Sequence, residues 1–467
     1  MNFRNHSIPR RDFLKRSAAV AASTAIGPLV ANLAAMGDAA AATANDYKAL
    51  VCVFLYGGND YANTLVPYDP ASYAKYQSIR SGLAYPSSSL SNTVLLPASV
   101  PTDVSGAKRQ YALAPELAAL LPLFDSGKMG VLLNVGNLIQ PTTKAQYQTN
   151  SVPLPSKLFS HNDQQSEWQS SGAEGTTTGW GGRMEDLLVS GNRNPIFSCV
   201  NVYGNAVMLA GQATSQYQIT ANGAVGLSAA TSLFGSQMAA RTLQSIMTAG
   251  SRYPMESDYA GVMAQALSAH DTLNSALTSA PAIRTPYPNS NSLADQLKMV
   301  ARTASVASSL GVKRQVFFVA LGGFDNHDNL ATIHPQLLSQ VAGALSAFYS
   351  TTVELGLASA ITTFTMSDFG RTLAVNNDGS DHGWGSMHFV LGDAVKGQRF
   401  YGTPPVVATD GPDDVGQGRL LPTTSVDQYA ATLGQWFGLS DSQLLGVLPH
   451  LSNFTSANRN LGFMAAT

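Results

Sequence analysis

The chain alternates short apolar segments with longer stretches of helical spacing, and this alternation constrains the fold more than any other feature. Residues 50–55, 315–320 and 361–365 are short, apolar and rich in Val, Phe, Ile and Thr, which is typical of buried strands. Helical patterns cover residues 292–310 and 334–355, and both ranges lie between these strands. Strands joined by helices form a mostly parallel sheet with helices on both faces. The sequence therefore predicts an α/β fold.

Acidic and imidazole side chains follow these apolar segments. They are Asp60 in LYGGND, Asp325 and His327 in LGGFDNHD, Asp368 in TMSDFGRT, and Asp381 and His382 in DHGWGSMH. In an open α/β sheet, ligands bind outside the carboxyl ends of the strands. Carboxylates gathered there would repel one another unless a cation lay among them. A mixed oxygen and nitrogen shell favours zinc or manganese, with calcium and magnesium as alternatives.

The pattern thus predicts an active site that depends on a divalent metal. The expected metal ligands are Asp60, Asp325, His327, Asp368 and His382. Asp325 and His327 are two residues apart in an extended stretch, so their side chains should point to the same side. Asp381, next to His382, is a carboxylate that could orient the His382 imidazole.

The N-terminus has the pattern of an export signal. Arg10 and Arg11 form a twin-arginine pair that is followed by Phe-Leu-Lys, a modestly apolar stretch at 17–36 and the small residues Ala-Thr-Ala at 42–44. A membrane anchor is the alternative, but Pro28 and Asn32 interrupt the stretch and would make it a weak span. We expect a twin-arginine signal peptide at 1–44, recognition by the twin-arginine export machinery, and a periplasmic or secreted protein with no permanent membrane span.

Composition bears on the remaining domain, residues 45–467. Over the full chain only 12% of residues are charged, against about 25% in an average soluble domain, and the net charge is −2. This balance gives no basic surface for a nucleic acid. Residues 213–288 are low in charge and have helical patterns, which predicts a helical insertion or cap. Cys52 and Cys199 lie in apolar runs, where burial as small hydrophobic residues is favoured over a disulfide.

Several motifs resemble one bacterial family. These are GGNDYANTLVP, GGFDNHD, SDFGRT, DHGWGSMHFVLGDAVKG, the GWGGR turn at 179–183 and the ending TTSVDQYAATLGQWFG. Together they resemble the family called domain of unknown function 1501, which is similar to the alkaline phosphatase and sulfatase superfamily. The resemblance implies an alkaline-phosphatase-like, mostly parallel sheet. It also implies hydrolysis of phosphate or sulfate esters of small molecules or glycans, at one or two metals held at strand ends.

The resemblance also gives roles to single residues. Asp60 matches the Asp after the first strand, Asp325 and His327 match an Asp closely followed by a His, and His382 matches the last His. Asp368 matches the Asp of an Asp-His pair, but Phe369 stands where the superfamily has the His, so a second metal site would lack that ligand.

Substrate-binding residues are expected near these ligands. Arg371 could bind an anionic substrate group bidentately, or form a structural salt bridge. His388 begins an apolar strand and could replace His382 as a ligand, bind substrate, or be a buried, hydrogen-bonded histidine.

A nucleophile is expected from the resemblance, because hydrolases of this superfamily use a hydroxyl or modified Cys at a helix N-terminus, where free amides favour an anion. Ser160 precedes a helix expected from residue 162 and is the leading candidate. Thr142 and Thr143 after Pro141, and Thr64, are rivals. Without any of these, water activated by the metal could attack.

These expectations favour an exported metal-dependent hydrolase of phosphate or sulfate esters. The alternative is a non-catalytic binding or scaffold protein that retains the fold.

Overall fold

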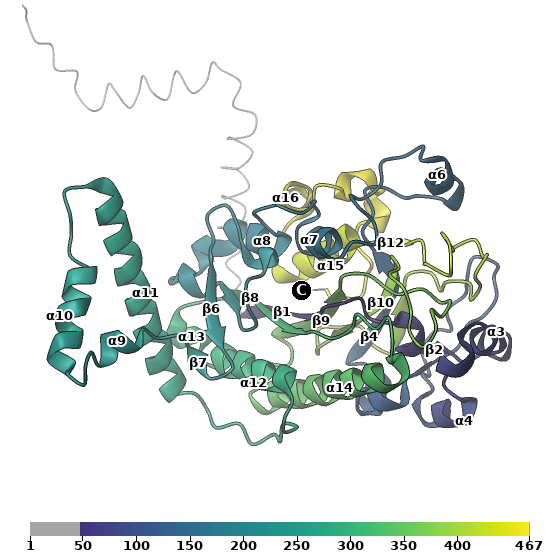
Figure 1. Cartoon of the computed structure of the whole chain (residues 1–467), viewed down its shortest axis with the longest axis horizontal. Helices are drawn as coiled ribbons and strands as arrows, with labels where there is room; N and C mark the ends of the chain where they lie inside the picture. The colour runs from purple at the N-terminus through teal and green to yellow at the C-terminus, as the bar shows by residue number, and fades with distance from the viewer. Residues whose placement is uncertain (1–46, 467) are drawn as a thin grey trace, which may run out of the picture. The chain divides into compact units, whose positions relative to one another are not determined.

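The computed structural model describes residues 47–466, and a mixed ten-stranded sheet lies at the centre of this part of the chain (Figure 1). Five neighbouring strands are parallel. In spatial order they are β9 (Ile361–Ser367), β1 (Lys48–Leu55), β8 (Arg314–Leu321), β5 (Cys199–Asn201) and β6 (Gln216–Thr220). The expected α/β fold with a mostly parallel sheet is confirmed.

The strands at the two edges of the sheet complete it. Beside β9, β10 (Ser386–Leu391) is antiparallel to both β9 and β4 (Met129–Gly136). The short strands β11 (Arg399–Tyr401) and β12 (Thr424–Ser425) run parallel to β4. At the other edge, β7 (Gly223–Ala224) is antiparallel to β6. A separate two-stranded sheet pairs β2 (Leu65–Pro67) with β3 (Tyr111–Leu113).

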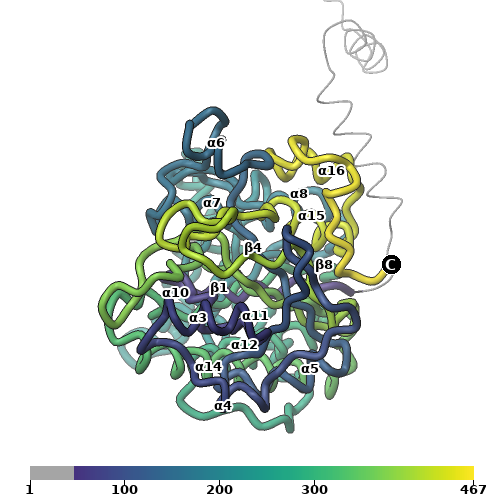
Figure 2. Tube along the Cα trace, turned by 90° about the vertical axis from the view of Figure 1, so that its right-hand side faces the viewer, coloured from purple at the N-terminus to yellow at the C-terminus, as the bar shows by residue number. Residues whose placement is uncertain are grey.

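Helices cover both faces of the sheet, because the strands are apolar on both sides. In β1, Val51 and Val53 pack into one core cluster, whereas Cys52 and Phe54 pack into the other. Helices α12 (Ser292–Ser305) and α14 (Leu330–Glu354) contribute to the first cluster. The opposite face holds α7 (His161–Ser170), α8 (Trp180–Leu188), α15 (Val426–Phe437) and α16 (Asp441–Val447). Figure 2 shows β1 and β4 between these two layers.

The two cysteines lie inside the second cluster. Cys52 and Cys199 are both buried and free, as the sequence favoured, and Cys52 Sγ lies 3.6 Å from Met366 Sδ. They therefore act as small core side chains.

The remaining helices surround this core. They are α3 (Pro70–Arg80), α4 (Ser87–Leu90), α5 (Leu121–Asp125), α6 (Lys144–Thr149), α9 (Ser228–Thr231), α10 (Gln237–Met247), α11 (Pro254–Thr278) and α13 (Ala307–Leu310). The stretch 213–288 includes β6 and β7 of the sheet before it becomes helical at α9, so only its later part is an insertion of helices.

The predicted signal peptide at 1–44 lies outside the described residues and stays a prediction. Within residues 47–466, none of the helices is long and apolar enough to span a membrane.

Candidate metal centre

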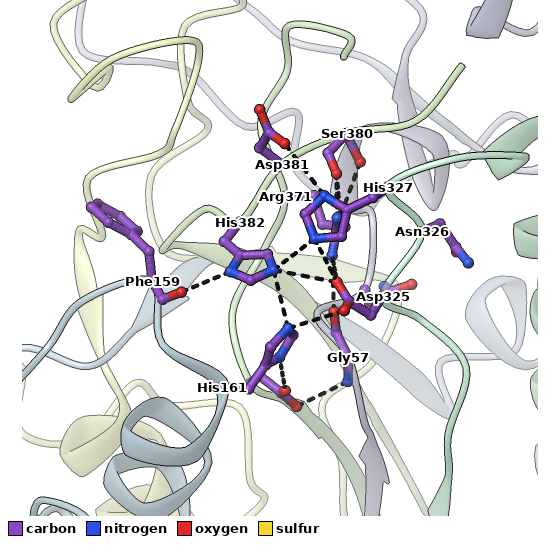
Figure 3. A network of polar contacts seen from close by, with 12 residues as sticks. Gly57, Phe159, His161, Asp325, Asn326, His327, Arg371, Ser380, Asp381 and His382 are labelled. Atoms are coloured by element: carbon purple, nitrogen blue, oxygen red, sulfur yellow. Dashed lines mark hydrogen bonds and ion pairs between the residues drawn. The ribbon is translucent and has the colours of Figure 1, made fainter. Parts of the chain in front are cut away.

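Three neighbouring parallel strands bring the predicted side chains to one edge of the sheet. β1 pairs with β8 on one side and β9 on the other, so the carboxyl ends of all three lie together. Asp325 and His327 follow β8, Asp368 directly follows β9, and His382 lies in the loop that leads to β10. Helix α7, which packs on the same face as α8 and α15, adds its first residue, His161 (Figure 3).

The Nε2 atoms of three imidazoles converge on the Asp325 carboxylate (Figure 3). His382 Nε2 lies 3.1 Å from His161 Nε2 and 2.9 Å from His327 Nε2. The Asp325 carboxylate lies 3.3 Å from the Nε2 atoms of His161 and His382 and 3.1 Å from that of His327. Among the described residues, one ligand atom each from His161, Asp325 and His382 lie within 4.8 Å of one another.

The other ring nitrogen of each imidazole faces a hydrogen-bond acceptor. His161 Nδ1 donates to Asp368 Oδ2 at 2.6 Å, and His382 Nδ1 donates to the Phe159 carbonyl at 2.7 Å. His327 Nδ1 lies 3.3 Å from Asp381 Oδ1. Because the Asp368 carboxylate and the Phe159 carbonyl can only accept, His161 and His382 carry a proton on Nδ1, and each ring in its neutral form has its lone pair on Nε2, directed into the cluster.

Three imidazole nitrogens and a carboxylate at these distances form a donor set for a cation. Four ligands at the usual zinc distances of about 2.0–2.2 Å define a tetrahedron with edges of about 3.3 Å. The separations among His161, His382 and Asp325, 3.1–3.3 Å, are close to that edge length. His327 Nε2 lies 2.9 Å from His382 and 3.1 Å from Asp325, but His327 is outside the group whose ligand atoms all lie within 4.8 Å of one another. Imidazole nitrogens suit zinc, and the donor set therefore fits one divalent ion of this kind.

Charge and burial adjust the protonation of these ligands. The hydrogen bond to Asp368 raises the pKa of His161, although burial opposes it. Burial lowers the pKa of His382, although its bond to the Phe159 carbonyl opposes this. Burial also acts to raise the pKa of Asp325, but the hydrogen bond and charge of Arg371 outweigh it, and the carboxyl pKa is below its usual value. Asp325 is thus a carboxylate at neutral pH.

Arg371 is a positioning residue for Asp325. Its guanidinium is fully buried, and Nη1 donates to Asp325 Oδ1 at 2.7 Å and to the Gly57 carbonyl at 3.0 Å. Its remaining donors contact Ser380. The structure thus shows the salt-bridge alternative for Arg371, and these contacts occupy the guanidinium that a substrate anion would need.

Gly57, in the loop after β1, contacts the loops that follow β8 and β9. Its φ is +118°, and a Cβ there would lie 2.3 Å from Asp325 N, so any larger residue would displace the β8 loop. Its N–H donates to Asp368 Oδ1 at 3.1 Å. Asp368 is fully buried and also accepts a bond from Gln165 Nε2 at 2.8 Å. Asp368 therefore lies behind His161, and it orients that ligand.

Aromatic rings support the imidazoles. The Phe369 ring is buried and lies 4.8 Å from the ring centroids of both His161 and His382. The residue that replaces an expected histidine thus forms an apolar wall of the cluster. Phe159 has a positive φ of 72°, and its ring lies 5.1 Å from the Arg419 guanidinium. Arg419 Nε donates to the His382 carbonyl at 2.7 Å, so this pair fixes the His382 loop.

The structure does not bring Asp60 into this cluster. Asp60 caps a short 3-10 helix by accepting from Ala62 N, and its carboxylate forms a fully buried ion pair with Arg80 of α3. Within residues 47–466, no hydrogen bond or ion pair links Asp60 to the cluster histidines. Asp60 is therefore a helix cap that also pairs with an arginine twenty residues later in the sequence.

His388 is also apart from the cluster. It is 1% exposed and lies against Trp168 and Tyr429, with ring centroids 4.7 and 6.3 Å away. Burial lowers its pKa to about 3, so it is neutral. As placed, His388 is a core side chain that substrate cannot reach.

The nucleophile candidates take local roles. Ser160 precedes α7, and its Oγ donates to Asp163 Oδ2 at 2.9 Å. Thr143 forms a capping box with Gln146 at the start of α6. Thr64 is buried and its hydroxyl donates to the Asp60 carbonyl at 2.7 Å. The catalytic role of Ser160 stays a prediction.

His161 is the residue that sequence reasoning missed. It directly follows Ser160 at the expected helix start, and that position was the available signal. The prediction that Asp381 orients the His382 imidazole is wrong. Asp381 faces His327, and the Phe159 carbonyl orients His382 in its place. Side-chain partners across loops depend on loop conformation, which the sequence pattern does not give.

A family comparison identifies the chain. The family described as "Protein of unknown function (DUF1501)" matches residues 47–448, and the chain belongs to this family. No curated protein sequence matches the chain.

Among solved structures, similar folds include sulfatases and an alkaline phosphatase. The PsFucS1 sulfatase from Pseudoalteromonas sp. is 9% identical, with a TM-score of 0.35 and coverage of 95% of this chain and 78% of that chain. Ps i-CgsB in complex with k-i-k-neocarrahexaose is 10% identical, with a TM-score of 0.34 and coverage of 89% and 77%. A mutant of the alkaline phosphatase PafA is 12% identical, with a TM-score of 0.27 and coverage of 70% and 64%.

Proposed function

We propose that this member of the DUF1501 family is an exported hydrolase of phosphate or sulfate esters that uses one divalent metal ion, with zinc favoured over manganese. The observation that carries the proposal is the convergence of three imidazole Nε2 atoms on one carboxylate. His161, His327, His382 and Asp325 would hold the ion. A divalent ion at this place acts as a Lewis acid toward an ester and lowers the pKa of water.

The protein groups around the cluster suit an anionic ester. The side chains of Asp325 and His327 are 44% exposed, against 25% for His161 and His382, so substrate would approach from the β8 loop. Helix α7 begins at His161, and Ser160 makes no side-chain capping bond to it. The free N–H groups of this first turn and the helix dipole would favour a phosphate or sulfate group.

Water is the attacking group in this proposal, and Ser160 is the alternative nucleophile. The Ser160 hydroxyl donates to Asp163 within its own helix, so it would have to break this bond before attacking an ester. Ser160→Ala separates the two routes. The water route keeps most of the hydrolysis rate, whereas the covalent route loses it because the attacking oxygen is gone.

One observation favours the non-catalytic alternative. Four protein ligands around zinc are typical of closed structural sites, whereas catalytic sites usually have three protein ligands and an open position. A binding or scaffold protein could use such an ion to fix its loops. Under this alternative the metal would stabilise the fold, and no ester would be hydrolysed.

The test combines metal content with ester hydrolysis. We expect about one zinc per chain by elemental analysis, hydrolysis of a phosphate or sulfate ester within a broad panel, and loss of both in His161→Ala. His270→Ala is the matched control, because His270 lies on α11 away from the cluster. Zinc without hydrolysis of any ester would favour the binding protein. If the wild-type chain binds no zinc and hydrolyses no ester, the proposal is refuted.

A further inference from the structure

A helical arm extends from the edge of the sheet, away from the candidate metal centre. We define the arm as residues 228–268, which comprise α9, α10 and the outer half of α11 (Figure 1). The inner half of α11 is anchored, because Ala269, Leu273 and Leu277 are buried in the core cluster on the α12 and α14 face. The arm therefore projects from a fixed base.

The arm carries the most exposed large apolar side chains of the described residues. Phe234 is 96% exposed, Met255 86%, Met238 79% and Ile246 69%. Within the arm, only Ala240 and Ala260 are buried. Two helices packed as a hairpin bury only the faces that contact each other, so their outer faces stay exposed. Exposed apolar groups gathered in this way mark a contact surface.

On α11 the exposed apolar residues are spaced for contact with another helix. Met255, Tyr259, Val262 and Ala266 follow at intervals of four, three and four residues, which places them along one face. On α10, Met238 and Ile246 are eight residues apart and also share a face. A partner that lies along these faces would itself be helical.

Charge and size indicate which partner fits. The arm has two basic residues, Arg241 and Arg252, and two acidic ones, Glu256 and Asp258, so its net charge is zero. Helices that bind membranes are usually rich in Lys and Arg on their polar face, and nucleic acid requires a basic surface. A neutral apolar face suits an identical face instead.

The exposed apolar area is sufficient for a dimer. Phe234, Met238, Ile246, Met255, Tyr259 and Val262 at their exposures present roughly 800 Å² of side-chain surface. A stable interface of ordinary size buries about this area on each partner. We propose that the arm is the dimerisation surface of this chain, and that two copies pack their arms as a four-helix bundle around a twofold axis.

The test compares one substitution at two exposed valines. Val262 on the arm is 63% exposed, and Val353 on α14 is 53% exposed, so glutamate should be tolerated by the fold at either position. We expect sedimentation of the purified chain to show a dimer. Val262→Glu should weaken dimerisation about a hundredfold or more, because the twofold axis places the change in the interface twice. Val353→Glu should leave the dimer unchanged.

Thermal unfolding of both variants shows whether each has kept its fold. A chain that is monomeric at every concentration would overturn the proposal, as would a dimer that Val262→Glu leaves intact. A monomer that sediments with vesicles of phosphatidylglycerol and phosphatidylethanolamine, and loses this in Val262→Glu, would replace it with a membrane contact.

Discussion

Asp368→Asn tests whether the residues behind the cluster control metal binding. The Asp368 carboxylate accepts three hydrogen bonds, from His161 Nδ1 at 2.6 Å, Gln165 Nε2 at 2.8 Å and Gly57 N at 3.1 Å. An amide has a single acceptor oxygen. If that oxygen faces His161, the amide NH₂ opposes the buried Gly57 N–H. If the amide is reversed, the NH₂ faces His161 Nδ1 and moves the imidazole proton to Nε2.

Either orientation should weaken metal binding. The first removes the negative charge that increases the basicity of His161, and the second blocks the lone pair that would bind the ion. Changes to such supporting carboxylates typically reduce metal affinity by 10–100-fold, which is about 1.4–2.8 kcal/mol. The unpaired buried donor should also destabilise the metal-free fold by about 1–3 kcal/mol.

Zinc affinity is measured by competition with a chromophoric chelator, and fold stability by urea unfolding without metal. Asp427→Asn is the matched control. Asp427 is also buried and accepts bonds from Ser171 Oγ and His450 N, on α15 away from the cluster. It should lower stability and leave zinc affinity unchanged. Equal zinc affinity in Asp368→Asn and the wild-type chain would refute the tautomer argument.

Three further predictions follow from particular residues. Arg80→Met leaves the Asp60 charge buried without its partner, which should lower the free energy of unfolding in urea by about 3–5 kcal/mol. Zinc affinity should stay unchanged, and a loss of zinc affinity would place Asp60 in the metal site. His388 has an ordinary pKa of 6.5 and a folded pKa of about 3, so the unfolded chain binds more protons below pH 6.5. Stability should therefore fall as pH falls from 6.5 toward 3, by up to about 1.4 kcal/mol per pH unit from this residue, and His388→Phe should reduce that slope in unfolding experiments at several pH values. Replacing Arg10 and Arg11 with Lys should retain the precursor in the cytoplasm on cell fractionation, and normal export of that variant would exclude the twin-arginine signal.

The sheet could be predicted from the sequence because its physical signal is local. Buried strands such as β1, β8 and β9 are short apolar runs, and parallel strands necessarily end at one edge. The convergence of Asp325 with His327 and His382 at that edge follows from this geometry.

The sequence pattern was less informative about charge partners. Asp60 lies at a strand end like Asp325, yet Arg80, twenty residues later, pairs with its carboxylate. His161 comes from a helix that follows a long loop, and the positive φ of Phe159 places the carbonyl that orients His382. Neither feature is encoded in a strand pattern. His388 lies within β10, which directs it into the core, whereas the cluster histidines lie in loops or at a helix start.

The most direct test of the account is a crystal structure of the zinc-loaded chain with anomalous diffraction measured on both sides of the zinc edge. The account predicts one zinc ion at about 2.0–2.2 Å from the Nε2 atoms of His161, His327 and His382 and from an Asp325 oxygen. It also predicts that the Asp60 carboxylate stays with Arg80. An ion bound by Asp60 or Asp368, or no anomalous peak at the three imidazoles, would contradict it.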